Sequence, residues 1–314
     1  MSLLVVGSMA YDAVETPFDN IKEALGGSAM FFASAASYFT AVNLVAVVGD
    51  DFNLDDINFL RHKNVNLDGL LIEKGETFRW GGRYLDNMID RETLYTKLGV
   101  FETFKPVLPE HYKNSTFIFL ANIQPDLQYN IVQQIDKPKF VAMDTMNFWI
   151  TGTTEQLKKT LAVVDCLIIN DSEVRLLSGE NNIFVGARVI QNMGPQTLIV
   201  KKGEHGSILI HNNAYFICPA VPVEQLYDPT GAGDTFAGGF MGYLAMADDL
   251  AEINLRRAVV TGTVMASFCV ESFSADRLKS LQESEIRERI TRLLNLIKVE
   301  PDNHWLTTSE RVLV

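Results

Sequence analysis

The segment 228–234 reads Asp-Pro-Thr-Gly-Ala-Gly-Asp, three small residues followed by an acid. Residues 231–233 have so little side chain that their main-chain amides can approach a ligand closely. The apolar run 235–245 is typical of a buried helix, and it places the small residues at the helix N-terminus, where free amides and the helix dipole attract an anion. Asp234 would repel that anion. We therefore interpret it as a base that accepts the proton of an attacking hydroxyl while the amides stabilise a transferring phosphoryl group.

Other glycine-rich motifs do not fit this segment. A dinucleotide fingerprint would need a third glycine at position 236, which is Phe, and a Walker A loop would need a Gly-Lys-Ser/Thr sequence that the chain lacks. A helix that simply begins with glycines and a favourable acidic charge remains the structural alternative.

The composition indicates a globular protein with excess negative charge. The 314 residues include 39 acidic and 27 basic side chains, which gives a net charge of −12, and 47% are hydrophobic. Because there is no basic cluster, neither a nucleic acid nor a membrane is an expected partner. The three cysteines and five histidines lack the spacing of a disulfide or zinc site, and the apolar start is too short for a signal peptide. We expect a cytoplasmic protein.

Short apolar strands alternate with helices along most of the chain, which predicts an α/β fold with a mostly parallel sheet. Several strands end in a polar residue, at 122, 144, 170 and 201, and such residues can converge on one cleft at the carboxyl edge of the sheet. The expected strands are 3–6, 42–48, 117–120, 140–143, 166–169, 197–200 and 207–210, and the expected helices are 29–39, 55–63, 235–245, 254–268 and 283–297.

Residues 75–97 interrupt this alternation. Two segments, 77–85 and 92–96, alternate aromatic with polar residues on either side of a polar turn, which predicts a half-covered hairpin. A hairpin inserted into an α/β chain can project as a flap over a site, although the pattern by itself favours an ordinary edge hairpin.

The longer string from Asp228 to Asp234, followed by a helix of small residues, closely resembles the C-terminal signature of the ribokinase-like (PfkB) carbohydrate kinase family. The resemblance implies a three-layer α/β/α fold, with one domain over 1–314 and a small β lid formed by about 12–24 and 75–97. It also implies ATP-dependent phosphorylation of a primary hydroxyl on a nucleoside or a sugar. A vitamin-precursor kinase of the pyridoxal or hydroxymethylpyrimidine type and a non-catalytic ligand-binding relative are the alternatives.

The resemblance assigns roles residue by residue. Asp234 would be the base, helped by the amides of Gly231, Ala232 and Gly233, and Glu173 would hold Mg²⁺ through water. ATP would bind at Asn170, Lys201, Gly203, Thr230, Gly231 and Gly233, the acceptor would bind at Asp12, Gly26, Gly27 and Ser28, and Asp228 would contribute to a site for a monovalent cation such as K⁺. Exposed lid strands in this family often pair between subunits, which implies a homodimer.

The residues themselves leave structural alternatives open. Asn170 and Glu173 have the spacing of a helix capping box, the turn at Gly203 could be a plain hairpin, and Gly26-Gly27 could serve close helix packing. Aromatic side chains that could stack on a nucleobase favour a nucleoside slightly over a free sugar, although core packing explains the Phe residues equally well. These aromatic residues are Phe31, Phe32, Phe78, Trp80 and Phe148.

Overall fold

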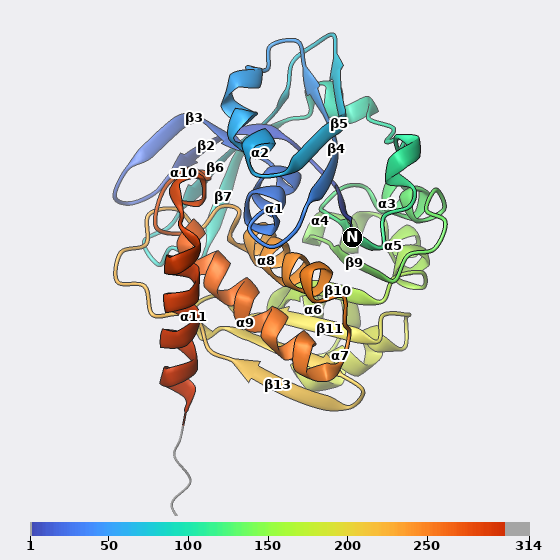
Figure 1. Cartoon of the computed structure of the whole chain (residues 1–314), viewed down its shortest axis with the longest axis vertical. Coiled ribbons are helices and arrows are strands. Elements are labelled where there is room, and N and C mark those ends of the chain that lie inside the picture. The colour runs from blue at the N-terminus through green and yellow to red at the C-terminus, as the bar shows by residue number, and fades with distance from the viewer. Residues whose placement is uncertain (1, 299–314) are drawn as a thin grey trace, which may run out of the picture.

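The first strand, β1 (Leu3–Val6), has buried side chains on both of its faces. Leu3 and Val5 enter one hydrophobic core, and Leu4 and Val6 enter a second. A strand with two apolar faces belongs inside a parallel sheet that has helices on each side. The computed structural model, which describes residues 2–298, places β1 within a nine-stranded sheet between two helical layers (Figure 1).

The large sheet is mostly parallel, as predicted. Its strand order is β13-β12-β11-β10-β9-β8-β1-β4-β5, and within the described residues the antiparallel pairs are β11–β12 and β12–β13. The remaining strands are β4 (Val42–Gly49), β5 (Val65–Glu73), β8 (Phe117–Leu120), β9 (Phe140–Asp144), β10 (Cys166–Asn170), β11 (Thr197–Lys201), β12 (Ser207–His211) and β13 (Ala214–Cys218).

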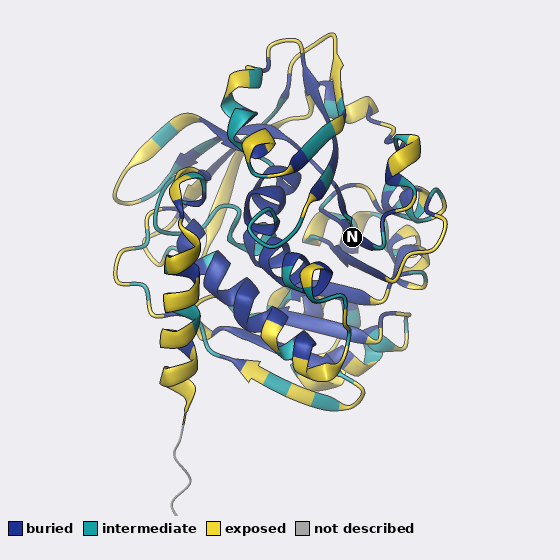
Figure 2. Ribbon diagram, in the orientation of Figure 1, coloured by how far each residue is buried: buried dark blue, intermediate teal, exposed yellow. Residues whose placement is uncertain are grey.

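Each face of the large sheet is covered by its own set of helices, so that the architecture is three-layered. Figure 2 shows the central strands and helices α1, α8 and α9 largely buried. One layer contains α1 (Ser28–Ala36), α2 (Asn58–His62), α8 (Ala232–Ala247), α9 (Glu252–Cys269), α10 (Asp276–Ser280) and α11 (Glu283–Ile297). The other contains α3 (Pro125–Val132), α4 (Asn147–Gly152), α5 (Thr154–Leu161), α6 (Asp171–Ser178) and α7 (Ile183–Gln191).

A second sheet, which we call the small sheet, has the order β3-β2-β6-β7. It consists of β2 (Ala10–Glu15), β3 (Asn20–Gly26), β6 (Phe78–Tyr84) and β7 (Arg91–Lys97). These strands include most of the two segments that the resemblance implied for a lid, and the expected hairpin is β6–β7, antiparallel. The small sheet is a separate sheet, not an extension of the large sheet's edge.

Several elements differ from the sequence-based expectation. The expected helix 55–63 is a 3₁₀ turn, Leu54–Ile57, followed by the short α2, and the helix expected at 29–39 ends at Ala36. The residue pattern did not predict strands β2, β3, β5 and β13 or helices α3, α4, α5, α7 and α10, although the resemblance implied a lid over the segment that contains most of β2 and β3. In β2 the pairing register shifts between Asp12 and Val14, so the alternation that identifies a strand is broken there.

Small residues let α8 pack against two other helices at close range. A Cβ built on Gly238 would lie 2.3 Å from the Phe32 carbonyl oxygen of α1, and one on Gly239 would lie 3.0 Å from the Gly262 Cα of α9. This packing fixes the start of α8, where segment 228–234 ends. Within residues 2–298, no helix is both long enough and apolar enough to cross a membrane.

Candidate active site

Four charged side chains meet where three neighbouring strands of the large sheet end. Asp144 ends β9, Glu173 lies in the first turn after β10, Lys201 ends β11, and Asp234 lies in the first turn of α8. They are close enough to affect one another: burial raises the pKa of Asp144 most, Asp234 and Glu173 raise it further, and Lys201 lowers it. The carboxyl edge of the parallel sheet therefore collects the charged groups, as it does in other open α/β folds.

The glycine-rich loop has the geometry of an anion site at a helix N-terminus. Gly231 precedes α8 with a φ of 77°, and a Cβ there would lie 2.4 Å from the Phe31 ring, so only glycine fits. The Ala232 amide donates to the Pro229 carbonyl at 3.2 Å and is thus already engaged. The Gly233 amide, at the second position of α8, has no acceptor one turn back within the helix.

Lys201 supplies positive charge beside this loop. Its Nζ lies 2.7 Å from the position that a Cβ on Gly233 would occupy. Burial raises the pKa of Asp234 to about 6, while the charges of Lys201 and of Arg91, the first residue of β7, act to lower it. A half-buried carboxylate with a pKa near neutrality is suited to accept a proton from an alcohol.

Sequence reasoning placed Asp144 among the polar strand ends that can converge on one cleft but gave it no catalytic or binding role. Its side chain is 8% exposed, and Oδ1 has no hydrogen-bond partner among residues 2–298. The feature of the sequence that points to it is its position, as a polar residue at the end of an otherwise apolar strand. An unpartnered buried carboxylate oxygen is costly unless a ligand or a cation completes it, so we include Asp144 in the site.

Asn170 and Glu173 form the capping box that their spacing allowed. The Asn170 Oδ1 accepts from the Glu173 amide at 2.8 Å, and the Glu173 Oε2 accepts from the Asn170 amide at 3.0 Å. Glu173 is nevertheless buried, and burial raises its pKa while Lys201 lowers it. The capping box therefore holds this buried carboxyl group at the cleft.

The oxygen donors at this edge fit Mg²⁺. Asp144 offers a buried oxygen without a partner, and Glu173 lies close enough to raise the pKa of Asp144 further. In the part of the chain that the structure describes, no three His, Cys, Asp or Glu side chains form a metal site by themselves. Mg²⁺ keeps several waters and commonly binds one or two carboxylates together with substrate phosphates, so two carboxylates are sufficient.

The four residues expected to contact the acceptor lie together where the end of β3 and the start of α1 meet β2. Asp12 is buried, and burial together with the charges of Asp228 and Asp234 raises its pKa to about 7. A Cβ on Gly26 would lie 2.0 Å from an Asp12 carboxylate oxygen, and Gly27 has a φ of 98°. The Ser28 amide donates to the Ser8 hydroxyl, and the Ser28 hydroxyl in turn accepts from the Ser8 amide.

Thr230 and Asp228 hold the start of the loop. The Thr230 amide donates to the Asp228 Oδ1 at 2.8 Å, and the Ser274 amide donates to the other carboxylate oxygen at 3.4 Å. Burial raises the pKa of Asp228. Within residues 2–298, the Asp228 carboxylate forms no ion pair. A bound cation would balance its buried negative charge. Gly203, in the 3₁₀ turn Gly203–His205 between β11 and β12, is exposed, with a φ of 56° and open space above its Cα.

The aromatic residues divide between the core and the surface. Phe31 and Phe32 are core residues, with Phe32 stacked on Phe119, so for these two the core-packing alternative holds. Phe78 stacks on Phe101, with 5.3 Å between the ring centroids. Phe148 is exposed and lies edge-on to Trp149, with 4.8 Å between the ring centroids.

Trp80 is the aromatic residue that lies on the small sheet near the acceptor residues. It pairs with Asp12 across the parallel β2–β6 ladder. A Cβ on Gly82 would lie 2.1 Å from its indole, so the ring packs directly against that glycine, and the Arg91 guanidinium is 5.2 Å from the ring centroid.

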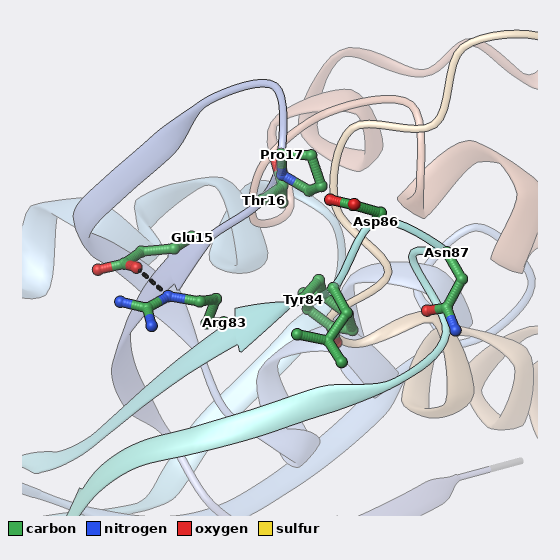
Figure 3. A pocket seen from close by; sticks show the side chains of 8 residues that line it. Glu15, Thr16, Pro17, Arg83, Tyr84, Asp86 and Asn87 are labelled. Atoms are coloured by element: carbon green, nitrogen blue, oxygen red, sulfur yellow. Dashed lines mark hydrogen bonds and ion pairs between the residues drawn. The ribbon is translucent and has the colours of Figure 1, made fainter.

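Two further small-sheet residues, Tyr84 and Arg91, reach the site and were missed. The Tyr84 hydroxyl lies 3.2 Å from the Thr230 hydroxyl, and Arg91 affects the pKa of Asp234. Tyr84 also lines a hollow of about 560 Å³. Figure 3 shows the side chains around it, with the Glu15–Arg83 ion pair on one side of Tyr84. Only pairing β6 with β7 brings Tyr84 opposite Arg91, so no local sequence signal links them.

Known proteins resemble this chain over nearly its full length. A cytidine kinase from Thermococcus kodakarensis is 26% identical over 269 residues, covering 82% of this chain and 95% of that protein. A nucleoside kinase structure from Methanocaldococcus jannaschii aligns with a TM-score of 0.75 at 20% identity, covering 93% and 98% of the two chains. A structure from Escherichia coli, assigned as a ribokinase II in complex with ATP and Mg²⁺, aligns with a TM-score of 0.76 at 19% identity, covering 93% and 99%.

The model of the pfkB family of carbohydrate kinases matches residues 2–280. That match includes both sheets, the glycine-rich loop and the carboxyl edge where the charged residues meet. The chain therefore belongs to the pfkB family of carbohydrate kinases and is an ATP-dependent kinase of a nucleoside or a sugar.

Proposed function

We propose that this enzyme transfers the γ-phosphoryl group of ATP to the primary hydroxyl of a nucleoside. The observation that carries the proposal is Asp234, a half-buried carboxyl group with a pKa of about 6, at the N-terminus of α8 and near the Lys201 ammonium. Asp234 takes the hydroxyl proton, and the amides at Gly231 and Gly233 stabilise the charge on the transferring group. The Ala232 amide contributes once it exchanges its Pro229 partner for the phosphoryl oxygen.

ATP lies along the carboxyl edge of the large sheet in this proposal. Lys201 neutralises phosphate charge, Thr230 and Asn170 border the phosphates, and exposed Gly203 lets the nucleotide approach the backbone. Glu173 and Asp144 would hold Mg²⁺, which offsets phosphate charge when bound. The Escherichia coli structure in complex with ATP and Mg²⁺ supports this choice of cosubstrate.

The acceptor lies against the small sheet, next to Asp12 and Trp80. Asp12 binds two ribose hydroxyls, with Gly26 and Gly27 allowing close approach and Ser28 beside them. The Trp80 indole next to Asp12 offers a stacking surface for a base. The names of the two relatives, a cytidine kinase and a nucleoside kinase, support a nucleoside over a free sugar, and cytidine is the first candidate.

Three further expectations belong to this proposal. Asp228 contributes to a K⁺ site beside the loop, because its buried carboxylate lacks a cationic partner in residues 2–298. The small sheet acts as the lid of a single domain over 1–314, and its exposed strand β7 forms a homodimer interface. The enzyme works in the cytoplasm on small molecules without a nucleic-acid or membrane partner.

A panel of acceptors tests the proposed substrate class. The protein is incubated with ATP, Mg²⁺ and single nucleosides or sugars, and ADP release is measured with and without K⁺. We expect turnover with cytidine or another nucleoside, and a rate that increases with K⁺. Turnover of free sugars alone would reject the nucleoside assignment, and no ADP release with any acceptor would reject the catalytic role of Asp234.

A further inference from the structure

Tyr84 makes a direct contact between the small sheet and the glycine-rich loop. It is the last residue of β6 and is only 5% exposed. Its hydroxyl lies 3.2 Å from the Thr230 Oγ1, and either oxygen can donate. Because Thr230 immediately precedes Gly231, this contact reaches the residue at which the amide cluster begins.

The main chain of Thr230 is also fixed, by residues outside the small sheet. Its amide donates to Asp228, and its carbonyl accepts from the Cys269 Sγ at 3.5 Å. Asp228 is in turn held by the Ser274 amide. The main chain of Thr230 is thus bound to the body of the protein, and its side chain is bound to the small sheet.

We propose that Tyr84 is a positioning residue that couples the small sheet to phosphoryl transfer, because its hydrogen bond to Thr230 holds the amides of residues 231–233 in place when the small sheet covers the site. This inference rests on the proposed kinase mechanism. Its structural basis is the Tyr84–Thr230 bond and the position of Thr230 next to the loop.

The surroundings of Tyr84 suit this role. Burial raises the pKa of Tyr84, so the phenol stays protonated at neutral pH and can donate or accept a hydrogen bond. Arg91 is paired with Tyr84 across the β6–β7 ladder, and its charge acts to lower that pKa. The same two paired residues therefore bring a hydroxyl to Thr230 and a positive charge to the vicinity of Asp234.

The substitution Tyr84→Phe removes the hydroxyl and keeps the ring. We expect kcat with ATP, Mg²⁺ and cytidine to fall about three- to ten-fold, the range of one neutral hydrogen bond, with KM for both substrates within about two-fold of wild type. Tyr95→Phe is the matched control, since Tyr95 packs over Gly81 of the same sheet and is 38% exposed. If Tyr84 serves packing alone, both variants retain the wild-type kcat, and the inference is wrong.

A double-mutant cycle tests whether the effect passes through Thr230. We expect Thr230→Val to reduce kcat and to cause little further loss in the Tyr84→Phe background, whereas Thr230→Ser, which keeps the hydroxyl, restores most of the wild-type kcat. If the fold-loss in kcat of the double variant equals the product of the fold-losses of the two single variants, the two hydroxyls act separately and the proposed coupling is wrong.

Amide hydrogen exchange provides a readout that needs no substrate. We expect Tyr84→Phe, but not Tyr95→Phe, to accelerate exchange in the segment 228–235. Unchanged exchange there would contradict the positioning role even if the acceptor were misassigned. Conversely, a wild-type protein inactive with every acceptor, but with the expected exchange difference, would reject the proposed function and leave the Tyr84 contact intact.

Discussion

Burial sets the charge of the acidic residues in this site. It is the largest cause of the raised pKa of Asp12, to about 7, and of Asp234, to about 6, and it also raises the pKa of Asp144 and Glu173. Lys201 opposes this effect at Asp144, Glu173 and Asp234. A site with this excess of buried acid favours a bound cation, which agrees with the proposed Mg²⁺.

Asp234→Asn removes the proposed base. We expect kcat to fall by about 10²- to 10⁴-fold while ATP binding, measured by calorimetry, is retained. Because the active form of a base is unprotonated, wild-type kcat/KM should fall as the pH drops below about 6. The control is Asp136→Asn at an exposed position, and near-normal turnover of Asp234→Asn would remove this residue from the mechanism.

We expect Asp12→Asn to lower the activity of the enzyme and to raise its stability above neutral pH. The ordinary pKa of Asp12 is 3.8, and in the folded protein it is about 7, so between these values the folded state holds a proton that the unfolded state releases. Stability from this group is therefore present at low pH and is lost as the pH rises through 7. We expect the variant to be more stable than wild type at pH 8 by on the order of 1–4 kcal/mol, and equal to it at pH 4.

Urea unfolding at both pH values measures this difference, and ADP release measures the accompanying loss of activity. A stability gain that is the same at both pH values would show that ionisation of Asp12 does not cause it.

Glu173→Gln separates the two roles of this residue. Gln also completes a capping box, so α6 should remain stable, whereas a neutral amide is a weaker partner for Mg²⁺ or its waters. We expect the Mg²⁺ concentration for half-maximal activity to rise about 10- to 100-fold. The matched control is Glu285→Gln in the capping box of α11, which should leave the Mg²⁺ requirement unchanged. Equal Mg²⁺ titrations for both variants would restrict Glu173 to capping.

At the scale of elements, the contact between α1 and α8 links the acceptor residues to the glycine-rich loop. α1 begins at Ser28, and α8 begins directly after Gly231. The helices approach closely because Gly238 has no side chain to separate it from α1. Their packing therefore fixes the distance between the ends that carry the two halves of the site.

Gly238→Ala tests this packing. A Cβ at this position would lie 2.3 Å from the Phe32 carbonyl oxygen, so α1 must shift, and we expect a loss of about 1–3 kcal/mol in the free energy of unfolding. Gly152→Ala is the control, because a Cβ on Gly152 meets nothing within 4 Å and should be neutral or stabilise by about 0.4–1 kcal/mol. Equal stability of the two variants would show that α1 and α8 tolerate a wider separation.

Helices and strands could be predicted where a single hydrophobic pattern continued without interruption through a buried segment. The strands buried on both faces, such as β1 and β10, were found because continuous apolar runs bounded by polar residues identify them. β2 was missed because its register shift breaks the alternation. β13 was missed because it lies at the edge of the sheet, with exposed Tyr215 and Ile217 in a short segment.

At the scale of the whole molecule, β7 is an exposed edge. All seven of its residues are exposed, and β6 is its pairing neighbour within the small sheet. Leu94 is 41% exposed, and Ile89, in the preceding turn, is 62% exposed. Exposed strand edges with apolar side chains readily pair with another chain, which supports the proposed homodimer.

Leu94→Lys should convert the dimer to a monomer. A lysine on an edge strand opposes pairing between chains because its charge would be buried. Light scattering coupled to gel filtration measures the mass of the wild type and the variant. Ile217→Lys, on the β13 edge of the large sheet, is the control and should remain dimeric. A monomeric wild-type protein, or a variant that stays dimeric, would contradict this interface.

The sequence by itself determined the family, the α/β class, the parallel sheet and the loop around Asp234, because each depends on a local pattern of residue types. The tertiary structure decided which distant residues join that loop. Asp144 enters through its strand's place in the sheet, and Tyr84 and Arg91 enter through the pairing of β6 with β7. It also assigned Phe31 and Phe32 to the core. Burial and long-range proximity arise only when the chain is folded, so no local pattern could have specified them.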